Sequence, residues 1–212
     1  MIRLEGISKR LGEQPVLDQV SLDFAAGSFT ALLGPSGSGK TTLLRVIAGL
    51  EAPDAGAVFL DGRDATRLRP GARGLGFVFQ GYGLFEHMTV AGNIGFGLRL
   101  RRVGRRVLRD RVDAMLALVR LEGLGERMPS QLSGGQRQRV ALARTLAVEP
   151  RILLLDEPFG ALDAAVREEL RTGLRAIHDA LGVTTVFVTH DRDEAEALAD
   201  RCVEMAAGRV VG

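Results

Sequence analysis

Cysteine is nearly absent from this 212-residue sequence, which contains only Cys202. A single thiol cannot form an intramolecular disulfide, so the disulfide-stapled scaffolds typical of small secreted proteins are excluded. Cys202 lies in the segment Arg201-Cys202-Val203-Glu204-Met205, which has the pattern of a short strand. We expect a structural thiol in a reducing compartment.

Long apolar runs are missing as well. No window approaches the roughly 18 apolar residues of a membrane-spanning helix, and the N-terminus, Met1 to Gly6, lacks the apolar stretch of a signal peptide. We therefore expect a cytosolic protein that meets a membrane only through a partner. With 46% apolar and 25% charged residues, the chain can bury one sizeable core, which predicts one compact domain.

Lysine is scarce too. Of 28 basic residues, only Lys9 and Lys40 are lysine. Most basic positions of this chain are arginine, so a lysine at position 40 indicates a site that needs a compact, rotatable ammonium instead of a planar guanidinium. The net charge of +2 is too small to indicate nucleic-acid binding by itself.

The remaining sequence alternates between two kinds of pattern. Short apolar runs bounded by glycine or charge are typical of buried strands in a largely parallel sheet, and they lie at 30–33, 152–155 and 184–188. Helical patterns lie between or after them, at 41–48, 136–148, 164–180 and 193–199. Strands that alternate with helices predict an α/β layered fold.

Two regions depart from this alternation. The first third has strand-like segments at 2–7, 20–24 and 57–60 with an Asp61-Gly62 turn, which predict an antiparallel β portion. From Gly81 to Arg127, apolar residues recur at helical spacing and predict a small helical insert. The insert is rich in arginine. We expect a charged helix face there instead of a nucleic-acid patch, because no aromatic platform accompanies the arginines.

A phosphate-binding loop is indicated by the segment Gly34-Pro35-Ser36-Gly37-Ser38-Gly39-Lys40-Thr41, which matches G-x-x-x-x-G-K-[ST] between a strand and a helix. Glycines let successive backbone N–H groups point at one anion, and the helix N-terminus adds positive potential. Lys40 would reach the β- and γ-phosphates of ATP, and the Thr41 hydroxyl would coordinate Mg²⁺. Thr42 completes the predicted nucleotide contacts.

Two adjacent carboxylates follow the apolar strand Arg151 to Leu155. Asp156 would hold the Mg²⁺ through water, while Glu157, one residue further, could orient and deprotonate the attacking water. An acidic pair that only caps a strand is the simpler alternative. The phosphate loop upstream favours the catalytic interpretation.

A second anion-binding helix start is indicated by Leu132-Ser133-Gly134-Gly135-Gln136, ahead of an amphipathic helix. One small domain rarely needs two phosphate sites for one nucleotide, so this one would serve a nucleotide held by a second copy. Leu-Ser-Gly-Gly-Gln between a phosphate loop and an Asp-Glu strand end resembles the ATP-binding-cassette (ABC) ATPase family. The resemblance covers essentially the whole chain.

The resemblance implies roles for further residues. It implies that Gln80, at the end of the strand Gly76 to Phe79, links Mg²⁺ and the attacking water to a transmembrane partner. It implies that Asp163 lies in a loop that crosses the dimer interface, and that His190 is a switch histidine that contacts the γ-phosphate. Leu11 stands where the family usually has an aromatic that stacks on adenine, so base stacking should be weaker.

The resemblance also implies an architecture and an assembly. The expected fold is a P-loop NTPase core with an N-terminal antiparallel β subdomain and an inserted helical subdomain at about 81–135, in a single ATPase domain spanning 1–212 without a C-terminal regulatory domain. Family members work as head-to-tail dimers, in which Ser133, Gly134, Gly135 and Gln136 of one copy complete the site on the other.

Chain length decides between branches of the family. The insert has no room for the long coiled-coil arms of members that act on chromosomes, and a lone cassette without a membrane span resembles importer ATPases whose permeases are separate chains. The segments Phe77 to Gln80, Leu84 to Val90 and Glu157 to Asp163 most resemble ATPases of sulfate/thiosulfate importers. The implied partners are membrane permeases at the cytoplasmic face and, indirectly, a solute-binding protein, with no nucleic acid expected. A non-transport member acting on nucleic acid or the ribosome is the alternative.

Overall fold

The computed structural model describes residues 1–160 and 164–211, which divide into two units. Unit 1 consists of Met1–Phe77, Arg151–Pro158 and His178–Gly212, and unit 2 of Val78–Pro150 and Phe159–Ile177. No helix within these described residues is long and apolar enough to cross a membrane.

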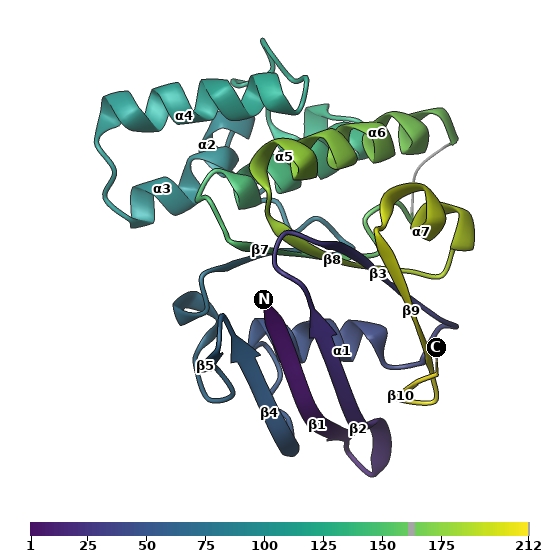
Figure 1. The fold of residues 1–212 in the computed structure, drawn as a ribbon. Helices are drawn as coiled ribbons and strands as arrows, with labels where there is room; N and C mark the ends of the chain where they lie inside the picture. The colour runs from purple at the N-terminus through teal and green to yellow at the C-terminus, as the bar shows by residue number, and fades with distance from the viewer. Residues whose placement is uncertain (161–163, 212) are drawn as a thin grey trace. The chain divides into compact units, whose positions relative to one another are not determined.

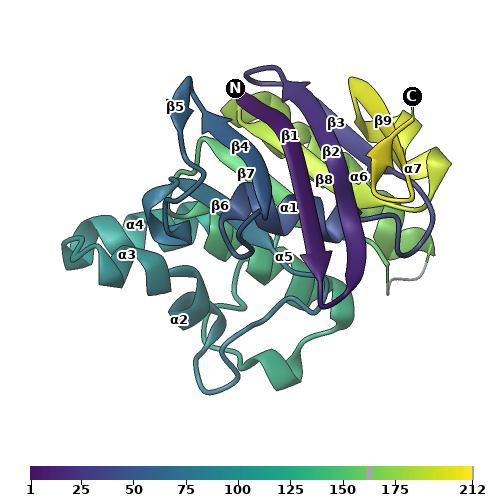
Figure 2. The same ribbon diagram turned by 90° about the horizontal axis from the view of Figure 1, so that it is seen from below.

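An antiparallel sheet of four strands forms the N-terminal part of unit 1, in the order β2-β1-β4-β5. Its strands are β1 (Ile2–Leu11), β2 (Gln14–Phe24), β4 (Ala55–Leu60) and β5 (Arg63–Asp64). Ile2 and Leu4 are buried while Arg3 and Glu5 are exposed, so one face of β1 packs on the core. The predicted antiparallel portion is confirmed, and Figure 2 shows that β1 and β2 form a long hairpin that the sequence patterns caught only at its base.

The second sheet of unit 1 has six strands, in the order β10-β9-β3-β8-β7-β6. Its strands are β3 (Phe29–Leu33), β6 (Leu75–Val78), β7 (Ile152–Asp156), β8 (Thr184–Thr189), β9 (Arg201–Ala206) and β10 (Arg209–Val210). Every residue of β3, β7 and β8 is buried, and these strands pair in parallel, as their continuous apolar runs predict. The carboxyl ends of β3, β7 and β8 therefore meet at one edge of the sheet.

The α-helices α1 (Lys40–Ala48) and α7 (Arg192–Leu198) belong entirely to unit 1. Helix α1 contacts β2 of the antiparallel sheet as well as β7 and β8 of the parallel sheet (Figure 1). Leu43, Leu44 and Ile47 of α1 are completely buried and join side chains of both sheets in one core cluster. The helix that follows the phosphate loop is thus fixed by the main core of the unit.

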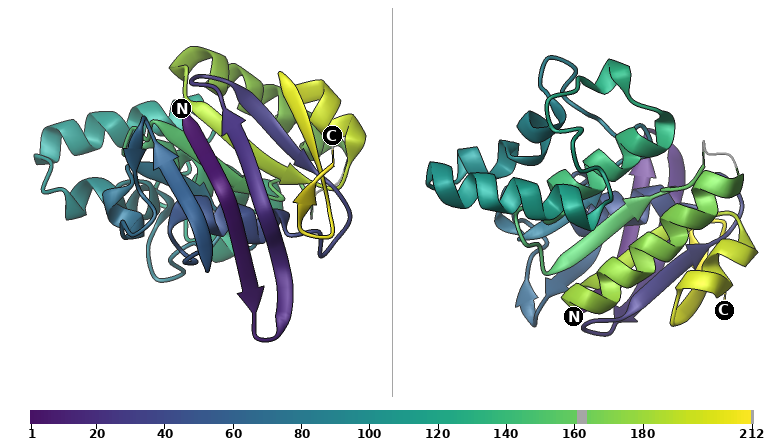
Figure 3. Two further views of the ribbon diagram at one scale, coloured as in Figure 1. Left: turned by 60° about the horizontal axis from the view of Figure 1, so that its bottom comes forward. Right: turned by 90° about the horizontal axis from the view of Figure 1, so that it is seen from above.

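Unit 2 is helical, with α2 (Val90–Ile94), α3 (Phe96–Leu100), α4 (Arg105–Leu118), α5 (Gly134–Leu146) and most of α6 (Ala164–Leu181) (Figures 1 and 3). Short 3₁₀ turns lie at Pro70–Ala72 in unit 1 and at Pro129–Gln131 in unit 2. The periodicity of α4 is confirmed, since Val112, Met115 and Leu116 are buried. Buried Asn93 donates to the carbonyls of Phe85 and Met88, both at 3.1 Å, and so fixes the loop ahead of α2.

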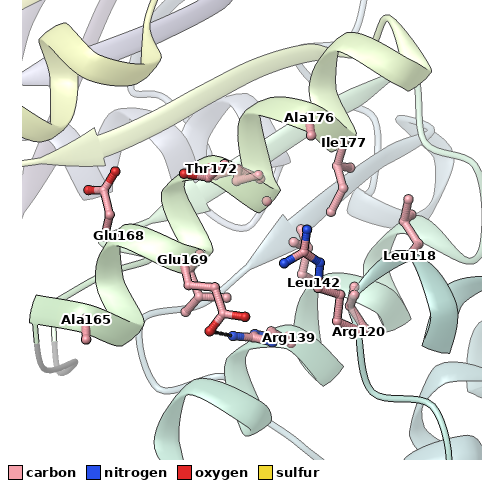
Figure 4. Close-up of a pocket in the computed structure, with 14 residues that line it drawn as sticks. Leu118, Arg120, Arg139, Leu142, Ala165, Glu168, Glu169, Thr172, Ala176 and Ile177 are labelled. Atoms are coloured by element: carbon pink, nitrogen blue, oxygen red, sulfur yellow. Dashed lines mark ion pairs between the residues drawn. The ribbon is translucent and has the colours of Figure 1, made fainter.

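A cavity of about 490 Å³ lies within unit 2, against α4, α5 and α6. Figure 4 shows the Arg139–Glu169 ion pair, 2.6 Å long, in the lining of this cavity, which also includes apolar side chains such as Leu142 and Ile177. Of the predicted site residues that the structure describes, none lines this cavity.

A buried arginine closes the C-terminus of α1. Arg73 donates to the carbonyl oxygens of Val46 at 2.8 Å and Ile47 at 2.7 Å, and also to those of Leu68 and Thr66. Burial lowers the pKa of this guanidinium. The planar fork satisfies carbonyls that the end of a helix leaves without partners, which a single ammonium cannot do as completely.

We predict that Arg73→Lys lowers the free energy of unfolding by about 2 kcal/mol, because buried carbonyls lose charged donors. Urea unfolding followed by circular dichroism measures the change. The matched control is Arg69→Lys at an exposed position four residues earlier, which should be neutral. Equal stability of the two variants would contradict the capping role of Arg73.

Candidate nucleotide-binding site

The segment between β3 and α1 has the backbone of a phosphate-binding loop. Gly34, Gly37 and Gly39 have φ of 149°, 80° and 98°, in the left-handed region that favours glycine. Space also demands glycine, because a Cβ on Gly34 would lie 2.1 Å from the Met205 carbonyl oxygen, and one on Gly39 would lie 2.7 Å from that of Val16. The loop therefore needs glycine at positions 34 and 39 for both φ and space, and at position 37 for φ.

Lys40 lies at the centre of this loop. Its Nζ donates to the carbonyl oxygens of Gly34 at 2.8 Å and Pro35 at 2.9 Å, and to Ser38 Oγ at 3.4 Å. Burial lowers the pKa of the Lys40 ammonium, while the nearby carboxylates of Glu157 and Asp156 oppose that shift. A partly desolvated cation inside a ring of backbone groups is suited to bind phosphate oxygens.

The contact between Thr41 and Asp156 links the loop to the end of β7. Thr41 Oγ1 donates to Asp156 Oδ1 at 2.7 Å. Burial raises the pKa of the Asp156 carboxyl, and the bond from Thr41 and the charge of Arg45 act in the opposite direction.

A hydroxyl and a carboxylate oxygen are the hard ligands that Mg²⁺ prefers, and Mg²⁺ completes its shell with water and substrate phosphates. The described residues contain no group of three or more metal-ligating side chains, so a dedicated all-protein cage is absent from that part of the chain. The donor pair of Thr41 and Asp156 therefore fits a magnesium ion that arrives with a nucleotide.

Glu157 diverges from Asp156 at the end of β7. Its φ of 46° is in the left-handed region, uncommon for glutamate, and its amide donates to the Val188 carbonyl at 3.2 Å. The turn separates the two carboxylates: Asp156 bonds Thr41, while Glu157 Oε1 lies 3.7 Å from His190 Nδ1. The side chain of Glu157 is 22% exposed and that of His190 is 61% exposed, so both can be reached from outside.

The turn that carries His190 is held by a buried pair that the sequence patterns did not single out. Thr189 Oγ1 donates to Glu194 Oε2 at 2.6 Å, and Asp191 caps α7 by accepting from the amides of Asp193 and Glu194. The spacing from Asp191 to Glu194, which is that of a capping box, is the signal that could have found it.

A second feature that the sequence patterns did not single out is the contact of the phosphate-binding loop with Gly208. Gly208, in the turn between β9 and β10, donates to the Ser38 carbonyl at 3.1 Å and accepts from the amide of Asp18 at 2.9 Å. A Cβ on Gly208 would lie 2.6 Å from the Val16 carbonyl oxygen. Nothing local in the sequence links these three remote segments.

Unit 1 thus brings together Gly34 to Thr42, Asp156, Glu157 and His190 at the carboxyl edge of its parallel sheet. Leu11, also in unit 1, ends β1 at the hairpin with 49% of its surface exposed. In the same hairpin, Val16 and Leu17 lie against Gly39 of the loop.

The other predicted site residues belong to unit 2 or lie outside the residues that the structure describes. Gln80 follows β6 at an exposed position. Ser133 caps α5: its Oγ accepts from the amide of Gln136 at 3.2 Å, and Gln136 Oε1 accepts from the amide of Ser133 at 3.0 Å. This capping box leaves the amides of Gly134 and Gly135 at the positive end of the helix. Asp163 lies outside the described residues.

Comparison with known proteins agrees with this geometry. The protein-family model described as ABC transporter matches residues 17–160. The sulfate/thiosulfate import ATP-binding protein CysA of Thermosynechococcus vestitus is 62% identical over 99% of this chain, and that of Caulobacter vibrioides is 60% identical over 99%. The chain spans 62% and 63% of the length of these two relatives.

Two solved structures match the whole chain. One is the dimeric ATP-binding cassette MJ0796 in a post-hydrolysis state bound to ADP and Pi, with 34% identity and a TM-score of 0.89. The other is a dimeric structure of MJ0796 described as a bacterial ABC transporter cassette, with 35% identity and a TM-score of 0.90. This chain covers 97% of each. The expected fold, a P-loop core with an antiparallel β subdomain and a helical insert, is thereby confirmed, and the chain belongs to the ABC transporter family.

Proposed function

We propose that the chain binds Mg-ATP on Gly34 to Thr42 and hydrolyses it, as the ATP-binding subunit of an ABC importer. The observation that carries the proposal is the 2.7 Å hydrogen bond from Thr41 to Asp156. Glu157, the residue after Asp156, is turned instead toward His190. This arrangement separates a pair of ligands for a metal from a pair of groups for proton transfer.

Each group would have a distinct part in hydrolysis. The loop amides and Lys40 would bind the phosphates, and Thr41 and Asp156 would hold Mg²⁺, whose charge offsets that of the phosphate oxygens. Glu157 would accept a proton from the attacking water at its carboxylate. His190, 3.7 Å from Glu157, would orient that carboxylate and contact the γ-phosphate, and Gln80 would sense the metal and the water.

The complete site would need two copies of the chain. The capping box of Ser133 and Gln136 forms within one copy and leaves the Gly134 and Gly135 amides available to an anion. In the proposed head-to-tail dimer, this helix start would face the nucleotide on the partner's loop, with Asp163 at the interface. Dimeric cassettes among the similar structures support this assembly.

The transported solute is proposed from the relatives. CysA proteins that are 60–62% identical carry the name sulfate/thiosulfate import ATP-binding protein. We infer an importer of sulfate, thiosulfate or another oxyanion. The cassette of residues 1–212 would act at the cytoplasmic face on separate permease subunits. A solute-binding protein would deliver the solute to those subunits. The competing function, a cassette that acts on nucleic acid or the ribosome, has no support in these names.

We predict that Glu157→Gln retains ATP binding and lowers the turnover rate by about 10² to 10⁴-fold, the usual contribution of a general base. Fluorescent-nucleotide titration and phosphate release measure the two quantities. Glu196→Gln, at an exposed position on α7, is the matched control and should turn over normally. Robust hydrolysis by the Glu157 variant would rule out the base assignment.

The composite site predicts a specific rescue. Lys40→Ala and Ser133→Arg should each abolish hydrolysis, whereas a mixture of the two should regain it, because the mixed dimer contains one intact site. A mixture of Lys40→Ala with Glu157→Gln is the control and should stay inactive, since both changes affect the same half of the site. If the first mixture also stayed inactive, the two-copy site would be refuted.

The shifted pKa of Asp156 predicts a pH-dependent stability. The pKa of Asp156 in the folded protein is raised above the ordinary 3.8, so the native state binds more protons than the unfolded state. The charged carboxylate therefore lowers the free energy of unfolding at a pH above the folded pKa. It has no such effect at a pH below the unfolded pKa, where the carboxyl is protonated in both states. Asp156→Asn should therefore raise the melting temperature in EDTA at pH 7, and the gain should vanish as the pH falls below about 4.

The control for this prediction has the opposite sign. A hydrogen bond from the N-terminal ammonium lowers the pKa of Asp61, so its carboxylate stabilises the fold above the unfolded pKa and loses that effect as the pH falls through the folded pKa. Asp61→Asn should therefore lower the melting temperature at pH 7. A destabilised Asp156→Asn would contradict the argument.

A further inference from the structure

The strongest concentration of charge in the chain is a segment of unit 2 that we call the basic tip, residues 99–111. It comprises the end of α3, the turn after it and the first half of α4, and Figure 1 shows this turn at the outer end of both helices. The basic tip contains seven arginines and one acidic residue, Asp110. The nucleotide chemistry proposed above uses none of them.

Three of the arginines are occupied within unit 2. Arg99 donates to the Gly92 carbonyl, Arg101 donates to the Val148 carbonyl at 2.8 Å, and Arg111 pairs with Glu149 at 3.1 Å. These contacts fix the ends of the basic tip against the neighbouring helices. These three arginines therefore have a structural role within unit 2.

The other four arginines have no such use. They are exposed, and within the described residues their guanidinium groups make no ion pair and no hydrogen bond; they are Arg102, Arg105, Arg106 and Arg109. Arg105 and Arg106 occupy the first turn of α4, which has no acidic residue and no side-chain cap. Cations at the positive end of a helix are unfavourable, so this arrangement would be relieved by anions outside the chain.

Two exposed apolar residues alternate with these arginines in the sequence. Leu100 is 71% exposed and Val107 is 61% exposed, more than any other large apolar side chain among the described residues. Basic residues interspersed with exposed aliphatic side chains are typical of helices that lie at a membrane interface, with the guanidinium groups at the headgroups and the aliphatic groups deeper. Nucleic-acid surfaces instead combine basic residues with aromatic platforms, which the basic tip lacks.

We propose that the basic tip binds directly to a bilayer surface that contains anionic phospholipids. The proposal goes beyond the ATPase function and does not depend on nucleotide chemistry. It also differs from the sequence-based expectation that the chain meets a membrane only through a partner. The four exposed guanidinium groups supply the electrostatic attraction, and Leu100 and Val107 supply apolar contact.

The test is co-sedimentation of the whole chain with phosphatidylcholine vesicles that contain 30 mol% phosphatidylglycerol, at about 0.1 M salt and without nucleotide. The variant replaces Arg102, Arg105, Arg106 and Arg109 by glutamine. The control replaces four exposed arginines elsewhere by glutamine, Arg63, Arg67, Arg69 and Arg127, and has the same net charge. Basic residues near an anionic surface contribute about fivefold each, so the variant should bind at least tenfold more weakly.

The expected results are binding of the wild type and the control, loss in the variant, weaker binding at about 0.5 M salt, and no binding to pure phosphatidylcholine. The double variant Leu100→Ser, Val107→Ser should also bind the vesicles more weakly. Weaker binding of this variant would show that apolar contact with the bilayer contributes in addition to charge. The proposal is overturned if the wild type ignores the anionic vesicles or if the control loses as much as the variant. It is likewise overturned if the variant loses binding to a labelled DNA duplex but keeps binding to vesicles. Unchanged ATPase rates of the variant in solution would keep this test separate from the proposed hydrolysis.

Discussion

The hydrogen bond from Thr41 to Asp156 depends on the parallel pairing of β3, β8 and β7. These residues are far apart in the sequence, and one strand separates β3 from β7 in the sheet. The register sets Leu33 beside Thr189 and Asp156 beside Val188, so the phosphate loop, the carboxylates and His190 all begin at the same edge. A change of register in any of the three strands would separate the groups that this bond brings together.

The fold holds several groups at this edge at a cost in free energy. Burial lowers the pKa of the Lys40 ammonium and raises that of the Asp156 carboxyl, so the interior disfavours the charge on both. Glu157 adds a left-handed backbone conformation, which costs about 1 to 3 kcal/mol where it is not relieved. Phosphate and Mg²⁺ would supply further countercharges, so binding can recover free energy that the fold gives up.

Local patterns allowed much of this to be predicted from the sequence. The phosphate loop, the strand before Asp156 and Glu157, and the strand before His190 each combine an apolar run with a distinctive end, and each lies where expected. The supports of the site could not be predicted, because they join remote segments through the backbone: Gly208 contacts Ser38 and Asp18, and Arg73 contacts Val46. The outer half of the β1–β2 hairpin was missed because shifts of register between Leu4 and Arg10 break the alternation of apolar and polar residues.

The start of α5 bears on how hydrolysis could be controlled. Its capping box forms within one chain, so contacts inside the helix fix Ser133 and Gln136. The phosphate loop is also held by contacts within one chain, from Lys40 to the carbonyl oxygens of Gly34 and Pro35. Since each half of the proposed site is held within its own copy, hydrolysis would depend on bringing the two halves together. A partner that favours or opposes this approach would set the rate of turnover without altering any catalytic group.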